Sequence, residues 1–451
     1  MNLSKNQIIV IGAIGLIVLF FVLLFLGVIP GLKKSGTGGN FGTIGGGSET
    51  VVNFWGIADN DDDVKAIRAV IEEYQKINKG VRIDFTPFSA EGGSASGGDN
   101  AKNYEKTLLN ALATGKAPDI ISFHSAWLTK HYDKIIPIPE TIFPLSALQQ
   151  LFPYVVEQDF VLRQDEKSFI VALPLYIDTL ALLYNKDMFD AKAISLPPTT
   201  WQTFQNLVPY LREVNLLNQI TKPASAIGGS EKNIDNASDL LNLLMAQFGS
   251  KMVDNYGKIS FGREGLPALN FYLQFSNPNS PYYTWNENLR YSLNSFSDGS
   301  TAMIFNYASR IPLIKAKNPY FRVGIAPMPQ PAGISQPLNY ADYWGLSVSN
   351  QSRQSDLAWN FILFATANPQ TAEIYLQISK KPPALLSLIQ KYINDPELGV
   401  FSRQALTARS WRQPDGNAIK QIFSNMIESI LSGKISPQQG LEQSENEING
   451  L

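Results

Sequence analysis

The stretch VVNFWGIADNDDDVKAIRAVIEEYQKINKGVRIDF, residues 51–85, decides the fold class. Residues 51–55 are mostly apolar and predict a strand, and residues 81–85 alternate between apolar and polar as a second strand. Between them, apolar side chains recur at helical spacing from Val64 to Ile77. A strand, a helix and a strand in this order are typical of a mainly parallel sheet covered by helices. We therefore predict an α/β protein.

The alternation of strand and helix continues further along the chain. A Gly/Ser-rich insertion at residues 91–100 precedes a helix expected at 104–114 and a buried strand expected at 120–123. Ligands of such sheets lie beyond the carboxyl ends of the strands. Trp55 and Trp127 follow two of these predicted ends, so each is a candidate for stacking on a ligand or, alternatively, a core residue.

The acidic run Asp59–Asp63 has two interpretations. A calcium loop of the EF-hand type needs glycine at its sixth position and glutamate at its twelfth, where this chain has Val64 and Val70. A solvated loop whose carboxylates stabilise the N-terminus of the following helix fits better. No metal and no cofactor are predicted.

The N-terminal region is unlike the rest of the chain. Ile8–Ile29 comprises 22 uncharged, almost wholly apolar residues, and as a helix it would span roughly 33 Å, enough for a bilayer. A Gly/Ser/Thr-rich tether, Gly31–Ser48, follows it. A cleaved signal peptide is the alternative, but its apolar region is usually shorter and ends at small residues. We expect an uncleaved anchor with the large C-terminal part on the extracytoplasmic face.

Composition excludes several classes of function. The net charge of −2 gives no basic surface for nucleic acid. Lipid attachment through cysteine and disulfide bonds are both excluded, because the chain has no cysteine. The sequence also lacks the H-E-x-x-H, G-x-S-x-G and P-loop signatures. Aromatic residues make up 11% of the chain, and some of these rings could stack on a sugar.

Six phrases in order resemble the family 1 extracellular solute-binding proteins, the maltose-binding-protein-like receptors of ABC importers. They are Leu112–Ile120 (LATGKAPDI), Leu173–Phe189, Pro198–Trp201 (PTTW), Phe296–Met303 (FSDGSTAM), Ala358–Gln370 and Lys381–Ala384 (KPPA). Each phrase alone is a weak indicator of the family. The six together occur in the family's order and extend over nearly the whole chain after the tether.

The resemblance implies an α/β, two-lobed fold of the periplasmic-binding-protein type II kind with hinge crossovers. The transmembrane helix expected before it departs from the family pattern, because these proteins are usually secreted or lipid-anchored. The expected organisation is an anchor at 1–30, a linker at 31–49, a first lobe at 50–173 with 304–344, and a second lobe at 174–303 with 345–451. The crossovers are expected near Leu173–Asp178, Met303–Phe305 and Trp344–Leu346. The lobes would close on a ligand like a hinged trap.

The expected ligand site lies between the lobes, and the resemblance favours Trp127 as a stacking residue. The full set of candidates is Trp55, His124, Trp127, Tyr176, Asp178, Asn306, Tyr307, Asp342, Tyr343, Trp344 and Trp411. His124 could equally be an ordinary satisfied histidine, and Tyr176 and Asp178 could set the hinge. Asp342-Tyr343-Trp344 precedes Gly345, a residue that permits unusual backbone conformations.

These observations predict a membrane-tethered receptor that captures a carbohydrate. Its expected partners are the permease subunits of an ABC importer with their ATPase, and the lipid bilayer through Ile8–Ile29; the receptor itself is expected to be a monomer. No catalysis is expected. The alternatives are a surface glycoside hydrolase using a carboxylate pair such as Asp178 and Asp342, a receptor for a polyamine or peptide, and an adhesin or scaffold.

Overall fold

The computed structural model describes residues 49–451, apart from 90–97, 218 and 255. The predicted span Ile8–Ile29, the tether Gly31–Ser48 and residues 91–97 of the insertion therefore lie outside the described residues. Within the described part of the chain, no helix combines the length and apolar character needed to cross a membrane.

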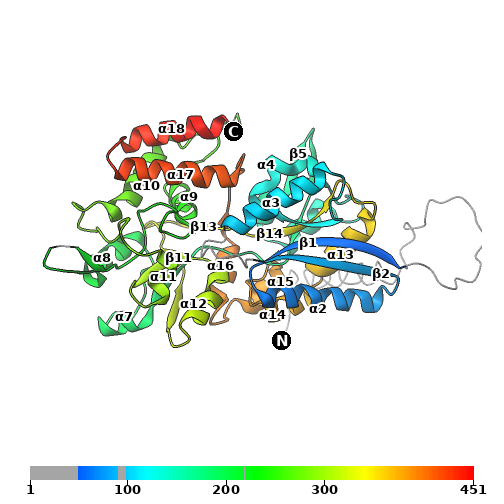
Figure 1. Ribbon diagram of the computed structural model, residues 1–451, viewed down its shortest axis with the longest axis horizontal. Helices are drawn as coiled ribbons and strands as arrows, with labels where there is room; N and C mark the ends of the chain where they lie inside the picture. Colours follow the sequence, from blue (N-terminus) through cyan, green and yellow to red (C-terminus); the bar gives the residue numbers. More distant parts are fainter. Residues whose placement is uncertain (1–48, 90–97, 218, 255) are drawn as a thin grey trace, which may run out of the picture. The chain divides into compact units, whose positions relative to one another are not determined.

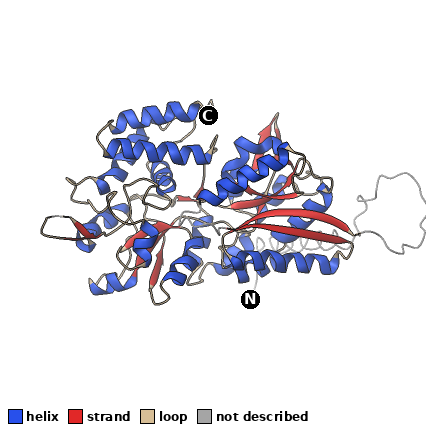
Figure 2. Ribbon diagram, in the orientation of Figure 1, coloured by secondary structure: helices blue, strands red, loops and turns tan. Residues whose placement is uncertain are grey.

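Two sheets organise the described residues, and each forms the centre of one lobe (Figures 1 and 2). The sheet of the first lobe has the order β2-β1-β3-β14-β4, with β7 beside β14. Its strands are β1 (Thr50–Ala58), β2 (Val81–Ser89), β3 (Ile120–His124), β4 (Ile135–Ile136), β7 (Leu173–Pro174) and β14 (Trp344–Ser349). β1 is parallel to β2 and β3, whereas β14 is antiparallel to β3, β4 and β7. The predicted parallel arrangement therefore holds for the first three strands.

Helices cover both faces of this first sheet. The covering helices are α2 (Asp61–Ile77), α3 (Gly98–Ala113), α13 (Ser355–Thr366) and α14 (Pro369–Ser379). On one face, the ring of Phe54 in β1 lies 6.2 Å from that of Phe361 in α13, which also contacts Tyr74 of α2. On the other face, Tyr104 of α3 packs against Phe88 of β2. Figure 1 shows α3 and α2 on opposite sides of β1 and β2.

The sheet of the second lobe is antiparallel, in the order β11-β8-β12. Its strands are β8 (Ala181–Asn185), β11 (Met303–Asn306) and β12 (Val323–Ala326). Successive residues of β8 point to opposite faces, so Leu182 belongs to one hydrophobic cluster while Ala181 and Leu183 belong to another. The larger cluster is covered by α8 (Trp201–Leu211), α9 (Ala237–Gln247), α10 (Gly262–Leu273), α17 (Gly416–Leu431) and α18 (Pro437–Asn449).

Local signals explain where several of these helices begin. Thr200 caps α8 in a capping box with Thr203, as the Thr-Thr-Trp sequence predicts. Asn60 caps α2 by accepting from the N–H groups of Asp62 and Asp63. Helix starts are thus readable from short-range sequence.

The remaining elements are short. The helices are α4 (Leu128–His131), α5 (Leu145–Leu151), α6 (Tyr154–Phe160), α7 (Lys186–Ala191), α11 (Ser292–Ser297), α12 (Ile311–Lys317), α15 (Leu386–Tyr392) and α16 (Gly399–Ala405). The 3-10 turns are η1 (Ser125–Trp127), η2 (Tyr132–Lys134), η3 (Gln274–Ser276) and η4 (Ala308–Arg310). Three strand pairs are separate from the two main sheets: β5 (Val161–Gln164) with β6 (Lys167–Ile170), β9 (Glu213–Val214) with β10 (Ile220–Lys222), and β13 (Asn339–Tyr340) with β15 (Ala408–Arg409).

Three connecting segments, residues 175–180, 327–343 and 406–415, run between the lobes and are bonded to one another. The N–H of Leu180 donates to the carbonyl of Tyr340, and that of Asp342 donates to the carbonyl of Asp178. The second and third segments pair through β13 and β15. Backbone bonds thus hold the three connections together as a hinge-like bundle.

The strand pairing differs from the predicted assignment of segments to lobes. Residues 304–344 were expected in the first lobe, but β11 and β12 pair with β8 of the second lobe. Residues 345–451 were expected in the second lobe, but β14 pairs with β3. Met303–Phe305 therefore lies inside a sheet rather than in a crossover. The reason is that a short apolar strand can pair with either sheet, so its partner is decided by tertiary contacts.

Candidate functional site

A cavity of about 160 Å³ lies between the two lobes, beside the connecting segments. It is lined by Asp59, His124, Ala126, Trp127, Tyr176, Asp178, Asn236, Asp239, Tyr307, Ser309, Arg310, Tyr340, Asp342, Trp344, Gln413, Gly416, Asn417 and Lys420. Both lobes and all three connections contribute to this lining, and most of the side chains are aromatic, charged or amide.

The wall from the first lobe is a cluster of aromatic rings. Trp344, at the start of β14, lies with its ring 5.1 Å from that of Trp127 and 4.7 Å from the imidazole of His124. The ring of Tyr104 stacks on Trp127 at 6.0 Å and an interplanar angle of 5°. Trp127 is only 6% exposed, so one face belongs to the core, whereas Trp344 is less buried. Trp344 is therefore the better platform for a flat ligand.

His124 and Asp342 are hydrogen-bonded on this wall, with Nε2 and Oδ1 2.9 Å apart. The Nδ1 atom of His124 accepts from the N–H of Ala126 at 3.2 Å, so Nε2 carries the proton that faces Asp342. Burial alone would raise the pKa of Asp342, but the neighbouring His124 and Lys420 outweigh it and hold that pKa well below its ordinary value. Asp342 is thus an ionised acceptor at the cavity.

The wall from the second lobe carries a second acid–base group. The hydroxyl of Tyr307 donates to Asp239 at 3.0 Å, and Lys420 of α17 lies 3.3 Å from the same oxygen. Burial raises the pKa of Asp239 despite the nearby Lys420. Arg310 lies with Nε 3.4 Å from Asp235, and among the described residues this Nε has no hydrogen-bond partner. This wall therefore presents both donors and acceptors.

The acidic run behaves differently from the solvated loop that was expected. β1 continues to Ala58, so Asp59 follows its end and lines the cavity. Lys381 is 3% exposed and places Nζ 2.6 Å from Asp59 and 3.1 Å from Asp63, which is also buried. The same Nζ lies 4.2 Å from the ring centroid of Tyr176. Only Asp61 and Asp62, in the first turn of α2, match the expected solvated acids.

Asp178 ties the first connection to the turn after β11. Its Oδ1 accepts from the N–H groups of Thr179 and Ala308, and its Oδ2 accepts from that of Ser309 at 3.0 Å. Burial raises the pKa of Asp178 to about 6, although these three bonds favour its ionised form. Both oxygens are committed to backbone, which fits the hinge role.

Seven of the sequence candidates line the cavity: His124, Trp127, Tyr176, Asp178, Tyr307, Asp342 and Trp344. Four do not: Trp55, Asn306, Tyr343 and Trp411. The side chain of Tyr343 points away from the cavity that its neighbours Asp342 and Trp344 line, because successive side chains of an extended chain alternate in direction. Its hydroxyl instead donates to Asp159 at 2.8 Å.

The other three candidates outside the lining are packed elsewhere. Trp55 lies within β1, with its ring 5.3 Å from that of Phe88, because the strand continues past it. Asn306 is 1% exposed and donates to Asp235. Trp411 is 8% exposed and donates to Asn242 at 3.2 Å in the core of the second lobe. Proximity in sequence to a strand end does not place these side chains at the cavity.

Sequence reasoning missed the cavity residues contributed by helices and connections. Asp239, in α9, is far along the chain from Gln413 and Lys420, which lie just before and within α17, and no local spacing relates it to them. Arg310 offered a signal, because it follows the candidates Asn306 and Tyr307 by a few residues. Asp239 offered another, as an acid in the first turn of an apolar helix.

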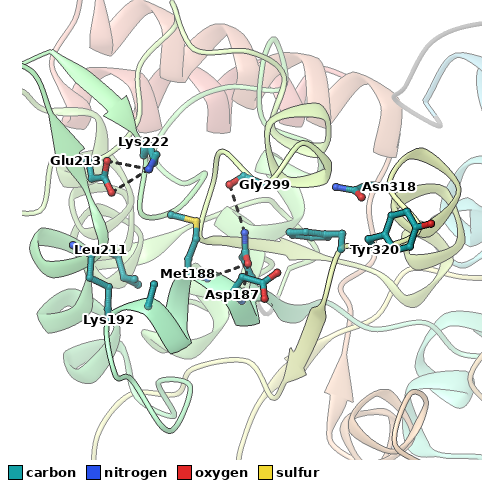
Figure 3. A pocket seen from close by; sticks show the side chains of 12 residues that line it. Asp187, Met188, Lys192, Leu211, Glu213, Lys222, Gly299, Asn318 and Tyr320 are labelled. Atoms are coloured by element: carbon teal, nitrogen blue, oxygen red, sulfur yellow. Dashed lines mark hydrogen bonds and ion pairs between the residues drawn. The ribbon is translucent and has the colours of Figure 1, made fainter.

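Two larger cavities lie within the second lobe alone. One, of about 410 Å³, has Lys222 paired with Glu213 on one side and the exposed ring of Tyr320 on the other (Figure 3). The other, of about 1010 Å³, is lined largely by amides and hydroxyls. Neither is lined by a residue of the first lobe, so neither lies between the lobes.

The family model for bacterial extracellular solute-binding proteins matches residues 58–372, and the chain belongs to this family. Among curated relatives, a binding protein of Brucella abortus (strain 2308) is 22% identical over 348 residues, covering 74% of this chain and 80% of the relative. A binding protein of Brucella suis biovar 1 (strain 1330) matches to the same extent.

Solved structures share the two-lobed fold. The cyclic α-maltosyl-1,6-maltose binding protein of Arthrobacter globiformis gives a TM-score of 0.71 at 19% identity, with 89% of this chain and 99% of that chain covered. The sugar-binding protein MalE of Xanthomonas citri gives 0.69 at 18%, covering 89% and 97%. An ABC transporter solute-binding protein of Thermotoga lettingae, bound with α-D-tagatose, gives 0.68 at 20%, covering 89% and 99%. At these identities the likeness establishes the fold, and the family is one of binding proteins.

Proposed function

We propose that this chain is an extracytoplasmic receptor that captures a sugar or oligosaccharide between its lobes and delivers it to an ABC importer. One observation carries the proposal: the inter-lobe cavity combines aromatic rings with paired charged groups. A sugar has apolar ring faces that stack on Trp344 and a rim of hydroxyls that donate and accept. Asp342 with His124 and Asp239 with Lys420 supply both kinds of partner. The sugars bound in several similar structures support the same ligand class.

The mechanism is closure without chemistry on the ligand. A ligand docks on one lobe, the other lobe rotates over it about the three connections, and the permease recognises the closed form. The apolar run Ile8–Ile29 anchors the receptor in the membrane, and the tether Gly31–Ser48 keeps it at high local concentration near its importer. Both carboxylate oxygens of Asp178 accept hydrogen bonds from backbone N–H groups. This residue therefore gives no support to the alternative that the protein is a glycoside hydrolase.

Thermal-shift screening of the chain tests this proposal. Monosaccharides, oligosaccharides, polyamines and peptides are compared, and a bound sugar is expected to raise the melting temperature increasingly with its concentration. Stabilisation by a polyamine or a peptide, but by no sugar, would show that the ligand belongs to another class of solute. Hydrolysis of a glycoside that is abolished by Asp342→Asn would show that the protein is an enzyme rather than a receptor.

Two tryptophans of the first lobe provide a matched comparison for the site. Trp344→Ala is expected to weaken binding of the identified sugar about fivefold to tenfold, because stacking contributes about 1 kcal/mol beyond burial. Trp55→Ala removes the same side chain outside the cavity and is expected to leave affinity unchanged. Isothermal titration measures both. Equal affinities in the two variants would remove Trp344 from the site.

A further inference from the structure

A polar cluster joins the first lobe to the start of α17 at the edge of the cavity. Nζ of Lys130, in α4, lies 2.6 Å from Oδ2 of Asp415 and 2.7 Å from Oε1 of Glu105, in α3. The side-chain amide of Asn417 donates to the other oxygen of Glu105 at 3.1 Å. His131 contacts Glu105 at 2.8 Å from within the first lobe. We call Lys130, Glu105, Asp415 and Asn417 the inter-lobe cluster.

The two sides of the inter-lobe cluster belong to different lobes. α3 packs on the first sheet, and the hydroxyl of its Tyr104 bonds to the backbone of β3. α17 packs against α9 and α18 of the second lobe. The approach is close, since a Cβ on Gly416 would lie 3.4 Å from Cβ of Ala126. Gly416, Asn417 and Ala126 also line the cavity, so the cluster borders the proposed ligand.

The charged side chains of the inter-lobe cluster are partly buried, so water weakens their interaction less than at an exposed surface. The side chain of Glu105 is 9% exposed, and those of Lys130 and Asp415 are 30% and 25% exposed. Burial alone would raise the pKa of Glu105, but hydrogen bonds from His131 and Lys130 outweigh it and lower that pKa to about 2. Partly buried, bonded charges of this kind interact more strongly than exposed surface pairs.

Each side of the cluster keeps partners of its own when the lobes separate. Glu105 retains Lys130 and His131, and Oδ1 of Asp415 retains the N–H of Ala418, which it caps at 3.1 Å. Opening breaks the contact of Lys130 with Oδ2 of Asp415 and that of Asn417 with Oε2 of Glu105, and all four freed groups can then bond to water. The contact is therefore reversible, because opening leaves no buried charge unpaired.

We propose that the inter-lobe cluster is a latch that favours the closed form, so that Lys130 and Asp415 set ligand affinity without touching the ligand. This rests on the proposed function, in which binding requires closure. Apparent affinity scales with the fraction of molecules that are closed. Loss of the latch is thus expected to weaken binding of any sugar by the factor by which it lowers that fraction, about threefold to tenfold.

The test measures lobe separation without ligand. The chain has no cysteine, so Lys79→Cys in the first lobe and Gln443→Cys in the second, both exposed, carry a pair of spin labels on the full chain. Lys130→Met and Asp415→Asn are each expected to shift the inter-label distances to longer values. Asparagine keeps the cap of α17 while removing the charge. The double variant is expected to shift no further than the single ones, since both break one contact.

Lys65→Met is the matched control, because Lys65 pairs with Asp62 at 2.8 Å within a single helix. It is expected to leave the distances unchanged. Unchanged distances in both Lys130→Met and Asp415→Asn, or equal shifts in the control, would overturn the latch. No sugar enters this experiment, so the latch can fail while sugar binding stands, and a failure of sugar binding leaves the distance result intact.

Discussion

Asp159 is a buried carboxylate that joins two connections to the first lobe, and it controls a pH dependence. It is 4% exposed and accepts hydrogen bonds from the hydroxyls of Tyr343 and Ser410. Burial raises its pKa to about 7, although both hydrogen bonds act in the opposite direction. The folded protein therefore holds a proton there at pH values where the unfolded chain has lost it.

This proton gives a prediction with a definite sign. The pKa of about 7 in the folded state exceeds the unfolded value of about 3.9, so the folded state binds more protons between these values. Stability is then greatest below pH 4 for this group and falls as pH rises toward 7, by at most about 1.4 kcal/mol per pH unit. Asp159→Asn removes the titration. Urea unfolding from pH 5 to pH 8 is expected to show the wild type losing stability relative to the variant, and parallel profiles would contradict this assignment.

Residue alternation also explains which ring faces the cavity. Asp342, Tyr343 and Trp344 are consecutive, yet only the first and third line the cavity while the second bonds to Asp159. The sequence offered the three as one cluster. An extended backbone divides them between the site and the core.

β14 illustrates how one element can depend on a single glycine. Gly345 was interpreted as a site of backbone freedom, but its φ is not positive. A Cβ there would lie 2.9 Å from the ring of Phe160, which is fully buried, and 3.1 Å from Cβ of Ala172. Glycine is therefore needed at this position for close packing, where β14 lies between β3 and β7 in the sheet.

Gly345→Ala is therefore expected to destabilise the protein by about 1–3 kcal/mol, the usual cost of overpacking a core. Gly80→Ala is the control, because a Cβ at that position would have no neighbour within 4 Å. It is expected to be neutral or slightly stabilising. Denaturant midpoints measure both, and a stability loss in Gly80→Ala equal to that in Gly345→Ala would refute the packing explanation.

At the scale of the whole molecule, the proposed anchor is a prediction from the sequence. Ile8–Ile29 is expected to remain in the mature chain and to hold it in the membrane fraction. A chain that lacks residues 1–48 is expected in the soluble fraction with the same sugar affinity, because every cavity residue follows the tether. Mass spectrometry of the mature N-terminus decides the point, and a chain that begins after Ile29 would show that the span is cleaved.

Patterns within short stretches of sequence determined much of this protein. Helical spacing after residue 61, the Thr200 cap and the alternation of strands with helices gave the α/β class, and six ordered phrases gave the family. They succeeded because periodicity and capping are local properties of the chain.

Tertiary structure alone decided which elements pair and which side chains come into contact. It placed β11 and β12 beside β8 and β14 beside β3, against the predicted lobes, because short apolar strands have no sequence mark for their partner. It also brought Asp239 to Lys420, Lys381 to Asp59 and Lys130 to Asp415. Each pair joins segments far apart in the chain, so only the packing of the complete fold could bring the charges within contact.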